Sequence, residues 1–351
     1  MPNAASYSTR LAVFPQDKAA VIGLWLSNLG TPEHAPDKFR WFYEESPLGK
    51  PLTLLLQCAH DRTQETVELA GVASAGTRSF VIRGEVVTAG VLVDMTVTSG
   101  HRTLFPALKL QKAVREAGLA ACRLLYGFPN AKAAPVFQRV GYRKLGMIHR
   151  YVRVLRTTRY LQRYLPSSLA AVAGAVVDAF LRLKTLACAR ASTDTRLRWL
   201  ELSEMRIEPT SSLTPAAVEI IRGVRDESFL RWRFGESRGR RIRFISVERR
   251  DGTQAGWWIA ENLADSLHVH DCSFSLTAGK EARHAWARLA AEAQAMGSSA
   301  LSFECLGPES VIETLRLAGL VVRGGRPVFA AVRNEGDASA AWFLTGADED
   351  E

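Results

Sequence analysis

Hydrophobic residues recur along the chain with two periods, and each period predicts one kind of element. Spacings of about three to four positions predict helices, and runs or alternations rich in Val, Ile and Leu predict strands. The predicted helices cover 19–29, 104–117, 131–140, 280–295 and 309–318. The predicted strands cover 51–58, 87–98, 122–128, 146–155, 242–247, 255–260, 267–274, 300–304 and 327–332. This order is typical of an α/β fold, in which a mixed twisted sheet is flanked by helices.

The pattern of the first half of the chain returns in the second half. Residues 39–46 (FRWFYEES) align with 230–237 (LRWRFGES), and 92–97 align with 269–274, each of the latter two preceding a helix of similar length. We therefore predict two copies of one α/β domain, over 1–157 and 196–335. Arg-Trp occurs in both copies, so we expect it to lock a helix onto the sheet rather than to bind a ligand.

Three other stretches carry patterns of their own. Residues 66–83 are predicted to form two strands around the turn-prone sequence Ser-Ala-Gly at 74–76. Residues 158–195 start basic and continue with Ala, Val and Leu at helical spacing, which predicts a helical connector between the copies. The same pattern fits a surface helix that lies flat on anionic lipid. Residues 336–351 are acidic, and we expect a flexible tail there.

Composition narrows the class of protein. The chain has 351 residues, 47% of them hydrophobic, which suffices for one large core or two medium ones. The longest uncharged apolar stretch, 164–177, is shorter than the ~20 residues that span a bilayer, and the first residues lack the pattern of a secretion signal. We therefore expect a cytoplasmic protein, with peripheral contact at the inner face of the membrane if the connector binds lipid. Five scattered cysteines predict neither disulfides nor a zinc site, and we expect no metal.

Charge is distributed unevenly along the chain. The formal net charge is +9, and no acidic residue lies between Glu116 and Asp178, where ten basic residues occur. A segment of this kind attracts phosphate-rich partners: a nucleotide cofactor, a nucleic acid or an anionic membrane surface.

The segment from the central strand to the following helices carries a family resemblance. A strand that ends at Thr96 and Val97, a helix that opens after Arg102, and Asn130 before a helix that closes at 141–142 resemble the GNAT family of acyl-CoA-dependent N-acyltransferases. The resemblance implies two tandem GNAT-like domains, the second of them degenerate. It also implies that the first strand splays from its neighbour, leaving room for the thioester of acetyl-CoA or another acyl-CoA as co-substrate.

The family's phosphate-binding signature, Arg/Gln-x-x-Gly-x-Gly/Ala, lies at the start of this helix, where unpaired backbone amides favour a pyrophosphate. Carried over to this chain, the resemblance assigns the cofactor to Thr96, Val97, Arg102, Leu104, Phe105, Pro106, Ala107 and Asn130. Two positions depart from the pattern. Phe105 stands where the family usually has glycine, and Phe137 stands where a tyrosine often protonates the leaving thiolate. Tyr126 or water would then serve as the acid.

The acceptor amine must lose a proton before it attacks, and Asp94 and His101 are the candidates to accept it. Asp94 and Thr96 share one face of the predicted strand, so that Asp94 can face a substrate cleft. The structural alternatives are that Asp94 caps a neighbouring loop and that His101 is merely exposed on a loop.

The sequence therefore predicts transfer of an acetyl or longer acyl group from acyl-CoA to a primary amine by direct attack in a ternary complex. The acceptor would be a small molecule or a lipid- or sugar-linked amine. Resemblance to tandem proteins of that setting favours amino sugars of surface-polysaccharide assembly. One alternative is a tRNA-dependent aminoacyl ligase of the peptidoglycan type, whose tRNA the basic segment would contact, although we do not otherwise expect nucleic acid as a partner. Another is a non-catalytic GNAT-like binding or sensor protein.

Overall fold

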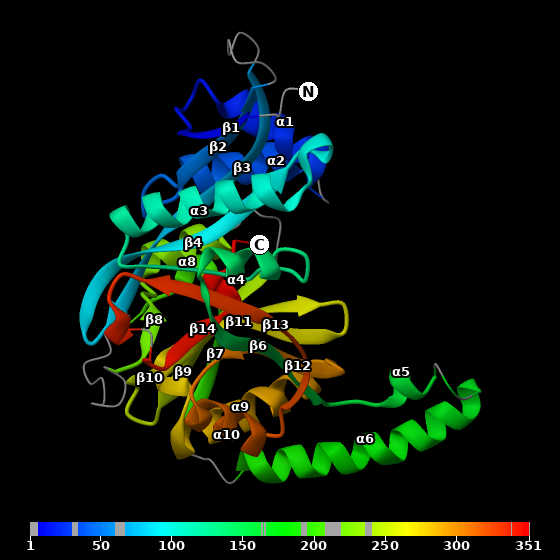
Figure 1. Ribbon diagram of the computed structural model, residues 1–351. Coiled ribbons are helices and arrows are strands. Elements are labelled where there is room, and N and C mark those ends of the chain that lie inside the picture. Colours follow the sequence, from blue (N-terminus) through cyan, green and yellow to red (C-terminus); the bar gives the residue numbers. More distant parts are fainter. Residues whose placement is uncertain are drawn as a thin grey trace.

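The computed structural model describes residues 6–29, 34–59, 67–162, 164, 166–190, 195–207, 219–235, 241–337 and 339–350 (Figure 1). Residues 236–240, in and after the second repeated segment, and 191–194, at the end of the predicted connector, lie outside this part of the chain. The strands join into one fourteen-stranded mixed sheet with helices packed against it, which confirms the predicted fold class.

The elements follow one another in the predicted alternation. The strands are β1 (Ser6–Leu11), β2 (Leu52–Ala59), β3 (Val67–Ile82), β4 (Glu85–Val97), β5 (Leu124–Gly127), β6 (Arg143–Val154), β7 (Thr195–Glu201), β8 (Ile221–Gly223), β9 (Ile242–Arg249), β10 (Gln254–Leu263), β11 (Ser266–Cys272), β12 (Ala300–Leu306), β13 (Val321–Val332) and β14 (Trp342–Thr345). The α-helices are α1 (Lys18–Asn28), α2 (Ala35–Lys38), α3 (Leu104–Ala121), α4 (Ala134–Val140), α5 (Thr158–Leu161), α6 (Ser167–Arg190), α8 (Glu227–Phe234), α9 (Gly279–Ala295) and α10 (Glu309–Leu317). A π-helix, η2 (Phe39–Glu44), continues α2.

The two halves of the chain exchange a strand. The sheet order is β1-β2-β3-β4-β5-β13-β6-β12-β11-β10-β9-β7, with β8 and β14 attached beside it. β13 pairs with β5 of the first half, while β6 pairs with β12 of the second. β6 and β13 also pair with each other, so that Arg143 lies opposite Ala330 and Val152 opposite Val321. Each half is thus completed by a strand of the other, and the boundaries at 157 and 196 stay predictions.

The two repeated Arg-Trp segments meet between the halves. Trp41 of η2 stacks on Trp232 of α8, with ring centroids 4.8 Å apart and planes 14° apart. Each indole N–H donates to the carbonyl oxygen of the other tryptophan at 2.9 Å. We expected these residues to lock a helix onto the sheet in each copy. Trp41 belongs to a core that contains sheet residues, and the two tryptophans also lock the two corresponding helices onto each other, as a two-fold related contact does.

Alternation along β2 builds a core on each face of the first half of the sheet. Leu55 packs into the core that contains Trp25 of α1 and Phe39 of η2, whereas Leu54 and Leu56 pack into the core beneath α3 and α4. The helices on the two faces thereby hold β4 and β5 between them.

One continuous strand, β3, replaces the two strands and turn that we predicted over 66–83. Residues 74–76 lie extended in the sheet, where Ser74 pairs with Val93 and Gly76 with Val91. An added Cβ on Gly76 would lie 2.3 Å from Cζ of Phe42. The glycine therefore permits the close approach of η2 and does not mark a turn.

Residues 342–348 are packed into the protein, although we predicted a flexible tail over 336–351. β14 pairs with β12 and β8, and the buried Asp348 that follows it lies 2.7 Å from Arg225. Asp337 is also buried and lies 2.9 Å from Arg123. The acidic residues that suggested solvent exposure are partners of arginines instead, because a buried charge requires a counter-charge.

The connector consists of α5 and of α6, which runs past α9 and out beyond the sheet (Figure 1). Contacts with α9 and α5 hold α6 in place. Among the residues that the structure describes, no helix is both long and apolar enough to cross a membrane.

Candidate active site

The parallel strands β4 and β5 diverge in the middle of the sheet. They pair only from Ala89 opposite Leu124 to Val91 opposite Tyr126, while β4 runs on to Val97. The divergence coincides with a bulge, where Asp94 and Met95 of β4 lie opposite one residue of β3. Asp94 adopts the left-handed conformation there, with φ of 55°, which is rare for a residue with a side chain. The family resemblance implied a gap here, and the pairing of the two strands stops before Asp94.

A cavity of about 320 Å³ opens at this gap. Its walls come from α1, α2, β3, β4, the middle of α3 and the turn that leads into α4. Polar lining groups include His34, Lys38, Ser74, Asp94, Gln111, Asn130 and Asp350, and Trp25, Leu92, Met95, Phe128 and Phe137 are among the apolar ones. The cavity therefore combines an apolar wall with convergent polar groups, which is typical of a small-molecule site.

Asp94 is the buried acid of this cavity. Its Oδ1 accepts a hydrogen bond from Lys38 Nζ at 2.7 Å, and its Oδ2 accepts one from the Tyr43 hydroxyl at 2.8 Å. Burial raises the pKa of the Asp94 carboxyl, and the Lys38 ammonium only partly opposes this rise. A carboxylate with a raised pKa is a better proton acceptor near neutral pH than an exposed one.

Lys38 bridges two carboxylates. Its Nζ lies 2.7 Å from Asp94 Oδ1 and 2.6 Å from Asp350 Oδ2. Burial would lower the pKa of Lys38, but the two carboxylates outweigh it and raise this pKa, so the ammonium form persists. Burial and the Asp94 charge raise the pKa of Tyr43, whose hydroxyl therefore stays protonated, and its oxygen lies 2.9 Å from the Ser74 hydroxyl.

The start of α3 follows the end of β4 across one short turn. Thr103 at its N-cap makes no side-chain capping hydrogen bond, and the first turn contains no acidic residue. Pro106 lacks an N–H and so removes one of the amide donors that a helix start offers. Phe105 is exposed and its ring lies edge-on to Tyr7, with centroids 6.1 Å apart.

The predicted cofactor residues divide into exposed and buried ones. Arg102 folds back, with Nε 3.0 Å from the Val97 carbonyl and one terminal nitrogen 2.9 Å from the Asn28 side-chain oxygen. Thr96 and Val97 are buried. Asn130 lines the cavity, and its side-chain oxygen accepts two backbone N–H groups of the turn before α4 at 3.0 Å. Leu104 is exposed, Pro106 is buried and Ala107 is half-buried.

His101 and Tyr126, the other predicted catalytic residues, do not line the cavity. His101 is buried rather than exposed on a loop: its Nδ1 lies 2.8 Å from the Tyr7 hydroxyl and its Nε2 3.3 Å from Glu68. Tyr126 is fully buried and donates to the Asp348 carbonyl at 2.9 Å. Burial raises the pKa of Tyr126, so its proton is held in the core and is not offered to a leaving group.

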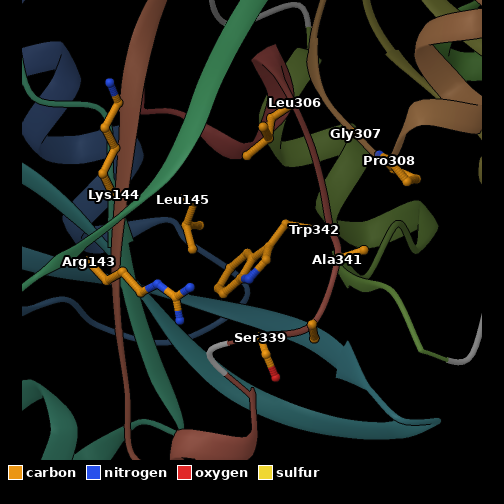
Figure 2. Close-up of a pocket in the computed structure, with 10 residues that line it drawn as sticks. Arg143, Lys144, Leu145, Leu306, Gly307, Pro308, Ser339, Ala341 and Trp342 are labelled. Atoms are coloured by element: carbon orange, nitrogen blue, oxygen red, sulfur yellow. The ribbon is translucent and has the colours of Figure 1, made fainter.

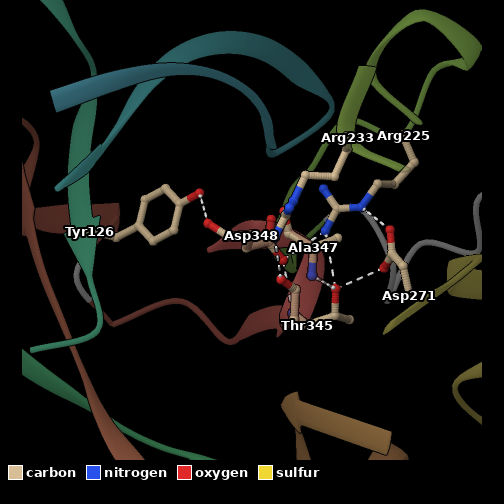
Figure 3. Close-up of polar contacts among 8 residues, drawn as sticks. Tyr126, Arg225, Arg233, Asp271, Thr345, Ala347 and Asp348 are labelled. Atoms are coloured by element: carbon tan, nitrogen blue, oxygen red, sulfur yellow. Dashed lines mark hydrogen bonds and ion pairs between the residues drawn. The ribbon is translucent and has the colours of Figure 1, made fainter. Parts of the chain in front are cut away.

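The second half has a counterpart of Asp94 that is sealed. Asp271 on β11 aligns with Asp94, and β11 pairs with β12 only as far as Val269 opposite Phe303. The space beyond is filled by β14 and the turn after it (Figure 3). Asp271 accepts from Thr345 at 2.8 Å and pairs with Arg225, which also binds Asp348.

Another cavity, of about 290 Å³, lies beside β14, where Arg143 extends toward the Trp342 ring (Figure 2). Lys144, Ser339 and residues 306–308 complete much of its wall, and none of the described residues that line it is acidic. A group that could accept an amine proton is thus present in the Asp94 cavity and absent from this described lining.

Sequence reasoning missed Lys38, Tyr43, Ser74 and Asp350. Lys38 and Tyr43 belong to or adjoin the repeated segment 39–46, which we interpreted as packing only. Asp350 contacts Lys38, which binds Asp94 in turn, and no local sequence pattern predicts a contact between residues 312 positions apart, the separation of Lys38 and Asp350. The signal for Tyr43 is its place as the hydroxyl-bearing residue within that aromatic repeat, since buried tyrosines need a polar partner.

Solved structures with the same architecture are known. One is a probable N-acyltransferase from Enterococcus faecalis V583, with a TM-score of 0.61 and 9% identity over 93% of this chain and 73% of that chain. A GCN5-related N-acetyltransferase from Anabaena variabilis has a TM-score of 0.61 and 11% identity over 95% of this chain and 74% of that chain. Another from Kribbella flavida has a TM-score of 0.57 and 13% identity over 95% and 73% of the two chains.

No protein-family model and no curated protein matches the sequence. Structural similarity at such low sequence identity establishes the architecture only. The activity has to be argued from the site. The chain therefore has the fold of the GCN5-related N-acetyltransferases.

Proposed function

We propose that this protein transfers an acyl group from acyl-CoA to a primary amine held in the Asp94 cavity. The observation that carries the proposal is a buried, bulge-borne carboxylate at the point where β4 and β5 separate. A GCN5-related fold alone would not suffice, because one fold hosts many functions.

The start of α3 fits the pyrophosphate of coenzyme A. Its first turn has neither an acidic residue nor a side-chain cap, so backbone N–H groups of Leu104 and Phe105 are suited to phosphate oxygens. Arg102 would add its charge by turning from the Val97 carbonyl, where it is now bonded. The acyl arm would lie in the gap between β4 and β5, beside Asn130. Coenzyme A would supply the activated thioester.

The charges of the cavity suit an amine acceptor. Asp94 and Asp350 face the single ammonium of Lys38, so the cluster favours an additional cation. An incoming ammonium would replace Lys38 at Asp94 and pass a proton to that carboxylate. The amine then forms a C–N bond with the acyl carbon as the C–S bond breaks. The second proton on the amine nitrogen passes through water to the departing thiolate, since Phe137 stands where the family often has tyrosine.

Amino sugars are the acceptor class that we propose to test first. Ser74, Gln111 and Asn130 line the cavity with groups that bond to hydroxyls, and the indole of Trp25 offers an apolar face. Acetyl-CoA is the simplest donor, and donors with longer acyl chains test the depth of the gap between β4 and β5. The acyl chain length and the setting of the acceptor are part of the proposal.

Calorimetry with coenzyme A tests the donor site. We expect binding, weakened by Arg102→Ala because the guanidinium no longer assists the pyrophosphate. No heat of binding at millimolar coenzyme A would overturn the acyltransferase proposal and favour a non-catalytic role. Binding of charged tRNA that falls steeply with salt, without acetyl-CoA uptake, would favour the aminoacyl ligase instead.

A steady-state assay with acetyl-CoA and a panel of amino sugars tests the base. Asp94→Asn keeps the shape of the side chain but removes its basicity, so kcat should fall by about 100-fold or more. Asp37→Asn is the matched control, because Asp37 is an exposed carboxylate next to Lys38 and pairs only with Arg40 in the contacts described. If both variants bind coenzyme A normally and are equally active, Asp94 does not accept the proton of the amine.

A further inference from the structure

Helix α6 is apolar on the side that faces away from the protein. Its inner side carries Gly174 and Thr185, both buried, with Asp178 between them. A Cβ on Gly174 would lie 2.5 Å from the Thr158 hydroxyl oxygen, so α5 packs tightly on this side. α9 packs against α6 as well, and Figure 1 shows α6 leaving the body beyond that contact.

The outer face, as we call it, consists of five large apolar residues spaced three or four apart. Each is 60–68% exposed: Leu169, Val172, Val176, Phe180 and Leu183. This spacing places them on one side of the helix, opposite Gly174 and Asp178. The stripe is about 21 Å long at 1.5 Å per residue. Monomeric soluble proteins rarely expose a continuous apolar stripe of this kind without a partner.

Of the charged side chains that the structure describes on α6, the acidic one is turned away from the outer face and the basic one is exposed beside it. Asp178 is the first acidic residue after Glu116, and it is turned inward. Its carboxylate accepts hydrogen bonds from the Thr157 and Thr158 hydroxyls at 2.8 and 2.7 Å. Arg182 is exposed between Leu181 and Leu183. The outer face is thus free of nearby acidic groups among the described residues of α5 and α6.

Two tyrosines lie just before the helix. Tyr160 and Tyr164 are exposed, and their rings lie 5.3 Å apart. Tyrosine is enriched where a protein meets the headgroup level of a bilayer, because its ring is apolar and its hydroxyl is polar. Aromatic, basic and apolar groups thus share one projecting part of the chain.

We infer that the outer face of α6 docks on the surface of an anionic bilayer, with the helix parallel to the membrane plane. Apolar burial provides the contact, and the acid-free basic segment before Asp178 provides attraction to anionic lipid. A second copy of the chain is a poorer occupant, because the same basic segments would face each other and repel. The inference does not depend on the proposed function.

Sedimentation with lipid vesicles tests the inference. We expect the full chain to bind vesicles of equal parts phosphatidylcholine and phosphatidylglycerol, to bind phosphatidylcholine alone at least tenfold more weakly, and to dissociate as salt is raised. Phe180→Glu should weaken binding to the anionic vesicles at least tenfold. Val86→Glu is the matched control, because Val86 is 65% exposed on β4 and should leave binding unchanged.

Two results would overturn the inference. One is equal sedimentation of the wild type with and without anionic vesicles. The other is a wild-type dimer in analytical ultracentrifugation that Phe180→Glu converts to a monomer, since the outer face would then be covered by a second copy. Far-UV circular dichroism and coenzyme A calorimetry on each variant separate a folding defect or a failed acyltransferase proposal from a failure of membrane docking.

Discussion

The ion pair of Lys38 and Asp94 in the candidate site gives a prediction whose size and sign follow from the structure. Lys38→Met removes the ammonium but keeps a long side chain, leaving the Asp94 carboxylate with the Tyr43 hydroxyl and facing Asp350. Loss of one partner of a buried pair costs about 3–5 kcal/mol. Because the Lys38 side chain is 25% exposed and that of Asp94 is 2% exposed, water can reach only one side of the pair. We therefore expect Lys38→Met to lower the free energy of unfolding by about 3 kcal/mol, at the lower end of that range.

The loss should depend on pH. Without Lys38, the pKa of Asp94 in the folded state rises further above the unfolded value of about 3.9. A group whose folded pKa is raised stabilises the protein fully below its unfolded pKa, and this contribution disappears as pH rises through the folded pKa. Lys38→Met should therefore be closer to the wild type near about pH 5 than near about pH 8.

Urea denaturation followed by circular dichroism at the two pH values measures the effect. Lys38→Met with Asp94→Asn should recover most of the stability at the higher pH, since the deeply buried Asp94 charge is gone and only the more exposed Asp350 carboxylate has lost its partner. Lys112→Met is the control, because Lys112 and its partner Glu116 are both exposed and their pair is worth less than about 1 kcal/mol. A loss in Lys38→Met that is equal at both pH values, or that the second substitution does not reduce, would refute the reasoning.

Two further predictions concern stability away from the site. Gly76→Ala should lower stability by about 1–3 kcal/mol in thermal melts, since its Cβ would collide with Phe42, whereas Gly100→Ala, whose Cβ meets nothing within 4 Å, should change little. Burial, and then the charge of His270, lower the pKa of His268 to about 4. The folded state therefore favours neutral His268, and up to about 3 kcal/mol of stability present above pH 6.5 should be lost as pH falls toward 4. His268→Gln should reduce the change of the urea-denaturation midpoint with pH across this window. A pH dependence equal to that of the wild type would contradict the assignment.

Local patterns predicted most elements of the fold because apolar periodicity depends on neighbours in sequence. The strand β4 and the helix α3 follow the predicted ranges closely, and the buried run of β2 is where it was expected. The wrong predictions concern contacts between residues that are far apart in the sequence. Gly76 looked like a turn residue because glycine is chosen equally for turns and for close packing, and only the position of Phe42 distinguishes the two.

The residues of the candidate site also divide into those that local sequence features predict and those that only distant contacts reveal. Asp94 was predicted because its strand, its face and the following helix start are all local features. Its partner Lys38 lies where α2 meets a π-helix, and Asp350, the second partner of Lys38, comes from a stretch whose acidity suggested solvent exposure. His101 was misjudged because a histidine after a strand gives no sign of whether a tyrosine from β1 will cover it.

The strand order explains how one chain can have one open site and one sealed site. Both halves place an aspartate where two parallel strands begin to separate, and in both the aspartate is buried beside a cation. Residues 342–348 fill the second gap, with Thr345 and Asp348 as the partners of Asp271 and Arg225 (Figure 3). The same stretch then brings Asp350 to Lys38, on the rim of the first gap. The same stretch of chain therefore closes the gap beside Asp271 and adds a carboxylate to the cavity of Asp94. Substitutions that loosen β14 should for this reason disturb the contacts of Asp271 and those of Lys38 together.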